Sequence, residues 1–185
     1  MLKRAAFLQS SKFNTLCIDL QAHGESEGTQ ITMGHLESID AKSGVQFLRN
    51  RFPFDPIIVV GSSLGAASAL MAPYNITPDA FIIEAAFSDL ETALTNRLSM
   101  SLGKSGNLLA PILTLQIKPR LGVSSKEISP LKSAASITTP TLIIVGGKDQ
   151  HATPKESREI YEALGGKKEL LRWLAKMEPA FKRDW

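Results

Sequence analysis

The sequence predicts an α/β fold, in which a mostly parallel sheet has helices on both of its faces. Short apolar runs rich in β-branched residues alternate along the chain with stretches of helical spacing. Polar and glycine-bearing residues follow the carboxyl end of each run. A chain of 185 residues with 43% hydrophobic content suits one core. We therefore expect residues 1–185 to form a single domain with its chemistry at the carboxyl ends of the strands.

The N-terminal third predicts two helices with a strand and a polar loop between them. Residues 2–8 have helical spacing, and the apolar run at 15–19 predicts a short buried strand. Cys17, the one cysteine of the chain, is then expected to be a small buried hydrophobe. A polar, glycine-bearing loop follows at 21–28. Residues 37–52 predict the second helix, which ends at the prolines that follow it.

The middle of the chain contains a G-x-S-x-G motif between a predicted strand and a predicted helix. The apolar run at 57–60 leads into Gly61, and small residues follow Gly65. This pattern predicts a nucleophile elbow with Ser63 at its apex, since side chains at the two glycines would collide where strand and helix cross. The backbone N–H of Leu64, at the start of the helix, would favour an oxyanion. The alternative is a glycine–serine loop that caps an ordinary helix.

Two more strands and three helical stretches are predicted downstream. Residues 80–84 and 140–147 are apolar runs typical of buried strands. Residues 89–100 predict a helix with an aspartate cap. The segment 102–130 is interrupted by glycine and proline, and we expect one or two short helices that form a cap over the sheet edge, or a surface helix pair with no gating role. Residues 154–164 predict the last of these helices.

Composition and motifs exclude several classes of function. The net charge is +3, from 21 basic and 18 acidic residues that are scattered, which does not predict nucleic-acid binding. No apolar run is long enough for a membrane span, and the N-terminus lacks a signal peptide, so a cytoplasmic location is expected. Dinucleotide, P-loop and zinc-protease motifs are absent, and no metal cluster is visible. We expect neither cofactor nor metal.

Three segments together resemble the α/β-hydrolase superfamily. Residues 22–28 are similar to its G-H-G-x-S-x-G turn, with Ala22 in place of the first glycine. Residues 61–65 resemble the nucleophile motif, and residues 146–149 resemble the G-x-x-D loop that delivers the acid. The three occur in the family's order and spacing. The resemblance covers residues 2–171, and looks closest to bacterial esterase- or peptidase-like hydrolases with a small cap.

The resemblance implies a role for each matching residue. Ser63 would attack an acyl carbon, Asp149 would orient and charge-balance a catalytic imidazole, and the Leu64 N–H would be one of two oxyanion donors. The implied substrates are small carboxylic esters or related acyl compounds. His23 matches a structural turn residue of the family and not the base. Other carboxylates at predicted strand ends, Asp19 and Glu84, are expected to be solvated or to cap turns.

The sequence departs from the family at the catalytic base. The family carries this histidine after its last strand, which residues 168–171 begin here, but residues 172–185 contain no histidine. His151 lies two residues from Asp149 and would share its loop, whereas acid and base normally approach from different loops. We therefore expect His151 to be an exposed loop residue.

A second departure lies at the front of the chain. The family has about three strands before the one at 15–19, the third of which carries the other oxyanion donor, and only residues 1–14 precede it here. Without that third strand, 15–19 and 57–60 would pair directly or leave both edges open. We expect a partial α/β-hydrolase fold, truncated at the N-terminus and altered at the C-terminus. The expected function is that of a serine hydrolase that lacks its catalytic histidine. The alternatives are an inactive binding or assembly module or gene fragment, or a homo-oligomer whose partner completes the site through the open edge.

Overall fold

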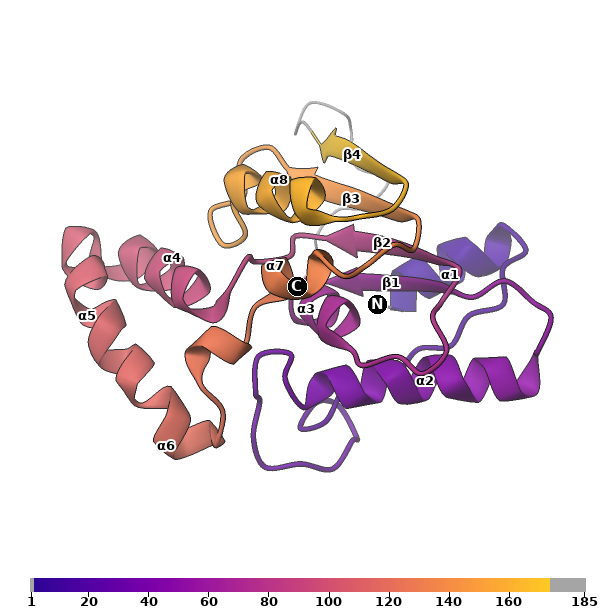
Figure 1. Ribbon diagram of the computed structural model, residues 1–185, viewed down its shortest axis with the longest axis horizontal. Helices are drawn as coiled ribbons and strands as arrows, with labels where there is room; N and C mark the ends of the chain where they lie inside the picture. The colour runs from indigo at the N-terminus through magenta and orange to yellow at the C-terminus, as the bar shows by residue number, and fades with distance from the viewer. Residues whose placement is uncertain (1, 174–185) are drawn as a thin grey trace.

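Four parallel strands organise the computed structural model, which describes residues 2–173 (Figure 1). The strands lie side by side in chain order: β1 (Ile58–Ser62), β2 (Ala80–Glu84), β3 (Thr141–Gly146) and β4 (Lys168–Trp173). Every neighbouring pair is parallel, so all four carboxyl ends meet at one rim. This confirms the predicted α/β fold with a mostly parallel sheet.

One face of the sheet is covered by three helices and holds the main core. These are α3 (Leu64–Met71), α7 (Pro130–Ala134) and α8 (Pro154–Ala163). Strand side chains alternate between the two faces, and those on this face are buried against the helices. The buried cluster consists of Ala66, Ala69, Leu70, Phe81, Ile83, Ala86, Ala134, Ile143, Ile160 and Leu164. The long helix α2 (Glu37–Arg51) packs on the outer side of α3 (Figure 1).

The opposite face is covered more thinly. Helix α1 (Leu2–Ser10) lies behind the sheet in the view of Figure 1, and its Arg4 forms an ion pair with Glu84 of β2. None of its residues is buried. The strand side chains on this face, among them Val60 and Ile82, are only half-buried. Helices thus lie on both faces, but the sheet is well packed on one.

The prediction of a buried strand at 15–19 is wrong. These residues form no strand within residues 2–173, and Leu16 and Ile18 are exposed. The reason is that β1 is the edge of the sheet among the described residues, so no strand beyond it is available to pair with this run. Cys17, expected in the core, is exposed for the same reason.

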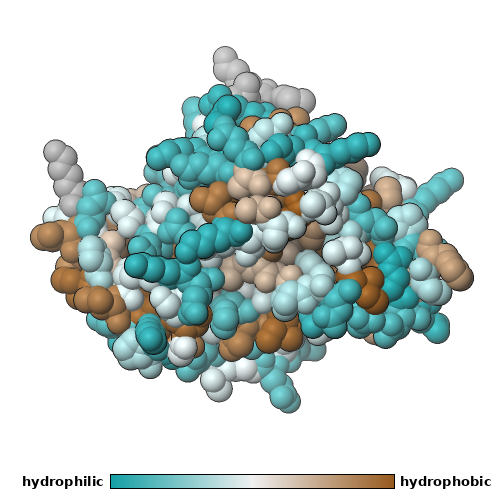
Figure 2. Space-filling model, in the orientation of Figure 1, coloured by the Kyte–Doolittle hydropathy of each residue, from teal (hydrophilic) through white to brown (hydrophobic). Residues whose placement is uncertain are grey.

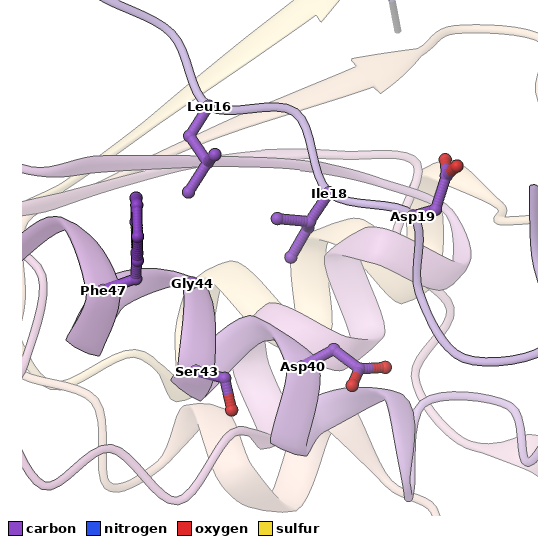
Figure 3. A pocket seen from close by; sticks show the side chains of 7 residues that line it. All are labelled: Leu16, Ile18, Asp19, Asp40, Ser43, Gly44 and Phe47. Atoms are coloured by element: carbon purple, nitrogen blue, oxygen red, sulfur yellow. The ribbon is translucent and has the colours of Figure 1, made fainter. Parts of the chain in front are cut away.

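Leu16 and Ile18 instead face α2 across an open hollow of about 340 Å³ (Figure 3). Phe47 of α2 lines the same hollow. Two consequences of a missing strand were expected, direct pairing or open edges; the part of the chain that the structure describes leaves an open edge at β1.

A helical excursion separates β2 from β3. It contains α4 (Leu90–Leu102), α5 (Lys104–Leu115), α6 (Ile117–Leu121) and the 3₁₀ turn η1 (Ser125–Glu127), and lies to one side of the sheet (Figure 1). Asp89 caps α4, because its carboxylate accepts a hydrogen bond from the Thr92 N–H at 2.8 Å. A second buried cluster anchors the excursion, formed by Ala67, Phe87, Leu90, Ala93, Ile117, Val123 and Ile128. The short helices expected within 102–130 are present; a gating role stays a prediction.

Asp79 fixes the backbone just before β1, and this contact predicts a pH-dependent contribution to the stability of the fold. The Asp79 carboxylate accepts hydrogen bonds from the Ile57 N–H at 2.8 Å and from Arg49 at 2.7 Å. The hydrogen bond from the Ile57 N–H lowers the pKa of Asp79 in the folded state the most, and the hydrogen bond from Arg49 has the next largest effect. A lowered folded pKa stabilises the fold above the unfolded pKa, and this stabilisation is lost as pH falls through the folded value.

We therefore expect Asp79→Asn to be destabilising near neutral pH, and its difference from wild type to shrink in acid. Urea unfolding from pH 7 down to about pH 2, well below the ordinary aspartate pKa of about 3.9, measures this difference. Asp55→Asn, on an exposed aspartate of the preceding loop, is the control. A difference that stays constant with pH would contradict the assignment.

Candidate active site

Ser63 occupies a sharp turn between β1 and α3. Its backbone angles are φ 52° and ψ −114°, and a positive φ is uncommon for a residue with a side chain. The Ser63 N–H donates to the Glu84 carbonyl at 2.9 Å, which continues the β1–β2 ladder into the turn. Its side chain is exposed and makes no hydrogen bond within residues 2–173. Such a conformation costs on the order of 1–3 kcal/mol and persists only where the surroundings impose it.

Gly61 is the residue that allows this turn to form. A Cβ at this position would lie 2.5 Å from the Gly65 carbonyl oxygen and 2.8 Å from the Ala66 Cα, both backbone atoms. The expectation that Gly65 is equally constrained is wrong. A Cβ there would meet no atom within 4 Å, so only Gly61 lies at the close crossing of strand and helix.

The Leu64 N–H begins α3 beside Ser63. The first N–H groups of a helix have no partner within it. Within the described residues the Leu64 N–H has no acceptor elsewhere either. The positive end of the helix therefore presents a free donor next to the Ser63 hydroxyl, which suits a developing negative charge.

Asp149 lies on the same rim, in the loop after β3. Its Oδ1 accepts hydrogen bonds from the N–H groups of His151 at 2.8 Å and Ala152 at 3.2 Å, so its own loop fixes the carboxylate. One strand, β2, separates the ends of β1 and β3. Because adjacent strands are about 4.8 Å apart, Ser63 and Asp149 follow strands whose axes are roughly 10 Å apart.

No imidazole connects these two residues in the described part of the chain. The His23 ring nitrogen Nδ1 lies 2.9 Å from the Gln21 carbonyl oxygen, consistent with a turn residue. His151 is exposed, as expected, and its ring bonds to neither Ser63 nor Asp149. The sequence has no histidine after position 151. Most of the tail predicted to lack the base, 174–185, lies outside the described residues.

Comparisons with known proteins show the family and the fold of the chain. The family model Hydrolase_4, described as serine aminopeptidase, S33, matches residues 2–130. The chain belongs to this family. The fold is accordingly that of the α/β-hydrolase superfamily, without a partner strand beyond β1 in the described residues.

Similar proteins include an uncharacterized bacterial protein and two esterases. YqkD of Bacillus subtilis (strain 168) is 29% identical over 162 residues, which is 85% of this chain and 53% of YqkD. The esterase Pf2001 of Pyrococcus furiosus has a TM-score of 0.68 and 27% identity over 94% of this chain and 65% of its own. Acetyl xylan esterase 1 from Thermoanaerobacterium sp. JW/SL YS485 has a TM-score of 0.65 and 15% identity over 94% of this chain and 63% of its own. At this identity the similarity shows only a shared fold. The chain spans about half the length of the curated relatives it matches.

The other strand-end carboxylates of this hydrolase-family chain have structural partners. Glu84 at the end of β2 pairs with Arg4, a partner that the sequence did not suggest. Asp19 accepts a hydrogen bond from the Glu25 N–H at 3.3 Å and lies against Gly24, which has a φ of 55°. Asp19 therefore caps the polar loop 21–28, in line with its expected role.

Sequence analysis missed Glu156, which holds the Asp149 loop in place. Glu156 is 2% exposed, and its carboxylate accepts hydrogen bonds from the Ser88 N–H at 3.2 Å, Asn96 Nδ2 at 2.9 Å and the Thr153 N–H at 2.8 Å. It thereby joins the loops after β2 and β3 to α4. The T-x-x-E spacing of Thr153 and Glu156 is a capping box, the local signal that could have revealed it.

We expect Glu156→Ala to destabilise the fold by about 2–4 kcal/mol, because it leaves the buried Ser88 N–H and the half-buried Thr153 N–H without an acceptor. Glu156→Gln keeps one acceptor oxygen and should cost less. Glu159→Ala, three residues further along α8 and outside the network, is the control. Urea denaturation measures all three, and equal losses for Glu156→Ala and Glu159→Ala would contradict this account.

Within the described residues, no helix is both long and apolar enough to cross a bilayer.

Proposed function

We propose that this chain carries the nucleophile and the acid of a serine hydrolase acting on small carboxylic esters or related acyl compounds. The Ser63 hydroxyl attacks the acyl carbon, the Leu64 N–H stabilises the oxyanion, and Asp149 orients an imidazole. The observation that carries the proposal is the exposed side chain of Ser63, whose backbone adopts a φ of 52° in the turn just before α3. The esterase Pf2001, at 27% identity, supports the ester class.

The chemistry of this site depends on a base that the described residues do not supply. A serine hydroxyl needs a neighbouring base to take its proton as it attacks. Removing one member of a complete triad costs roughly 10⁴- to 10⁶-fold in rate. We therefore infer that an ester acylates the chain only slowly when no other base is present. Ser63 is still the residue that becomes acylated.

Labelling with a fluorophosphonate probe tests this directly. Peptide mapping by mass spectrometry should locate the adduct on Ser63 after long incubation. Ser62→Ala, one residue away in β1, should label as the wild type does. An adduct on another serine, or none on a folded sample, would refute the assignment.

A second candidate is an assembly module, favoured by the open edge of β1. The Ser63 N–H bonds to Glu84 and the Ile57 carbonyl accepts from the Asp79 N–H, so alternate residues face β2. The intervening residues, Ile58, Val60 and Ser62, point their backbone groups outward, where residues 2–173 provide no strand. An exposed edge can pair with a second copy. Light scattering that finds only monomer at high concentration would exclude it.

A further inference from the structure

The outer side of α5 is apolar. Leu108 and Leu115 are each 78% exposed and Ile112 is 54% exposed. Their spacing of four and three residues places them on one side of the helix, which we call the α5 outer face. Figure 2 shows hydrophobic surface at the left edge of the molecule, where α5 lies in Figure 1.

The opposite side of α5 already has its packing partner. Gly106 and Ala110 are buried, and a Cβ on Gly106 would lie 2.4 Å from the backbone carbon of Leu98 in α4. Ser99 of α4 also donates a hydrogen bond to Asn107. A surface helix normally turns its polar side to water. Here the side turned away from the body of the protein is apolar, and nothing in the described residues covers it.

The segment of sequence that contains this face carries charges of one sign only. The sequence from 92 to 126 contains no Asp or Glu, and its basic residues are Arg97, Lys104, Lys118, Arg120 and Lys126. Lys118 and Arg120 lie on α6, directly after α5, and both are exposed without an ion-pair partner among the described residues. A second copy of the face would bring like charges together, whereas an anionic lipid surface complements both the charge and the apolar side chains.

We propose that the α5 outer face is a docking surface for an anionic lipid bilayer. Leu108, Ile112 and Leu115 insert at the boundary between headgroups and acyl chains. Lys118 and Arg120 lie at the anionic headgroups. Docking of this kind needs no reaction at Ser63, so it holds independently of the proposed hydrolase chemistry.

Co-sedimentation of the full chain with vesicles tests the proposal. The probes are vesicles of phosphatidylcholine alone and of phosphatidylcholine with about one third phosphatidylserine. We expect binding to the second kind, weakened by salt and by the double variant Lys118→Gln/Arg120→Gln. The triple variant Leu108→Ser/Ile112→Ser/Leu115→Ser should lower the partition coefficient at least about tenfold.

Matched controls distinguish binding through the α5 outer face from non-specific binding through other exposed apolar residues. The variant Ile39→Ser/Phe54→Ser replaces exposed apolar residues on α2 and the loop after it, and should bind as the wild type does. Ser63→Ala should also bind fully. Circular dichroism verifies that each variant is folded.

Three results would overturn the proposal. The first is a wild type that does not sediment with anionic vesicles. The second is a folded triple variant that binds as strongly as the wild type. The third is a dimer in light scattering that the triple substitution abolishes while vesicle binding is absent, which would assign the face to a second copy of the chain.

Discussion

Ester hydrolysis assisted by added imidazole should disappear in Ser63→Ala. Imidazole in solution can take the place of the base that the described residues lack, since it removes the serine proton from outside. General-base catalysis of this kind contributes roughly 10²- to 10⁴-fold in enzymes, and an unpositioned base contributes less. We expect the wild-type chain to hydrolyse p-nitrophenyl acetate faster than the imidazole buffer alone, and Ser63→Ala to fall to the buffer rate.

Two variants make this result specific to the site. Ser62→Ala should retain the imidazole-dependent rate, because the Ser62 hydroxyl has no part in the reaction. Asp149→Asn should lower the rate less than Ser63→Ala does, because free imidazole is not held against that carboxylate. An equal rate in wild type and Ser63→Ala would contradict the proposed hydrolase activity. The assembly module would then be the remaining candidate function.

The strands that the sequence predicted correctly are those with a neighbour in the sheet. Residues 80–84 are β2 to the residue, and the runs at 57–60 and 140–147 contain most of β1 and β3. The run at 15–19 has the same apolar character but lies exposed beside the sheet. An apolar run indicates that a strand can form; whether it does depends on a partner strand elsewhere in the chain, which local sequence does not reveal.

The candidate site shows the same division between local and distant information. The G-x-S-x-G and G-x-x-D motifs predicted Ser63 and Asp149 at one rim because each motif is local to a single turn. Glu156 was not predicted because its role depends on a hydrogen bond from Ser88, which lies 68 positions away in the sequence. The Arg4–Glu84 ion pair spans 80 positions and was equally invisible.

Gly61→Ala should cost far more stability than Gly65→Ala, although both glycines belong to the same motif. A methyl group at position 61 meets the Gly65 carbonyl oxygen at 2.5 Å and the Ala66 backbone at 2.8 Å. These atoms belong to the first turn of α3, so relief requires the helix to move away from β1. Overpacking of this kind costs about 1–3 kcal/mol, and more where backbone must shift.

Gly65→Ala is the matched control, because its methyl group points into open space. Alanine favours a helix over glycine by about 1 kcal/mol, so this variant should equal or exceed the wild type in stability. Urea denaturation measures both free energies of unfolding, and the two variants should differ by at least about 2 kcal/mol. The same displacement of α3 would shift the Leu64 N–H, so Gly61→Ala should also lose labelling at Ser63 under conditions where it remains folded. Equal stability of the two variants would mean that β1 and α3 cross less closely than described, and the strained turn would then no longer support Ser63 as the nucleophile.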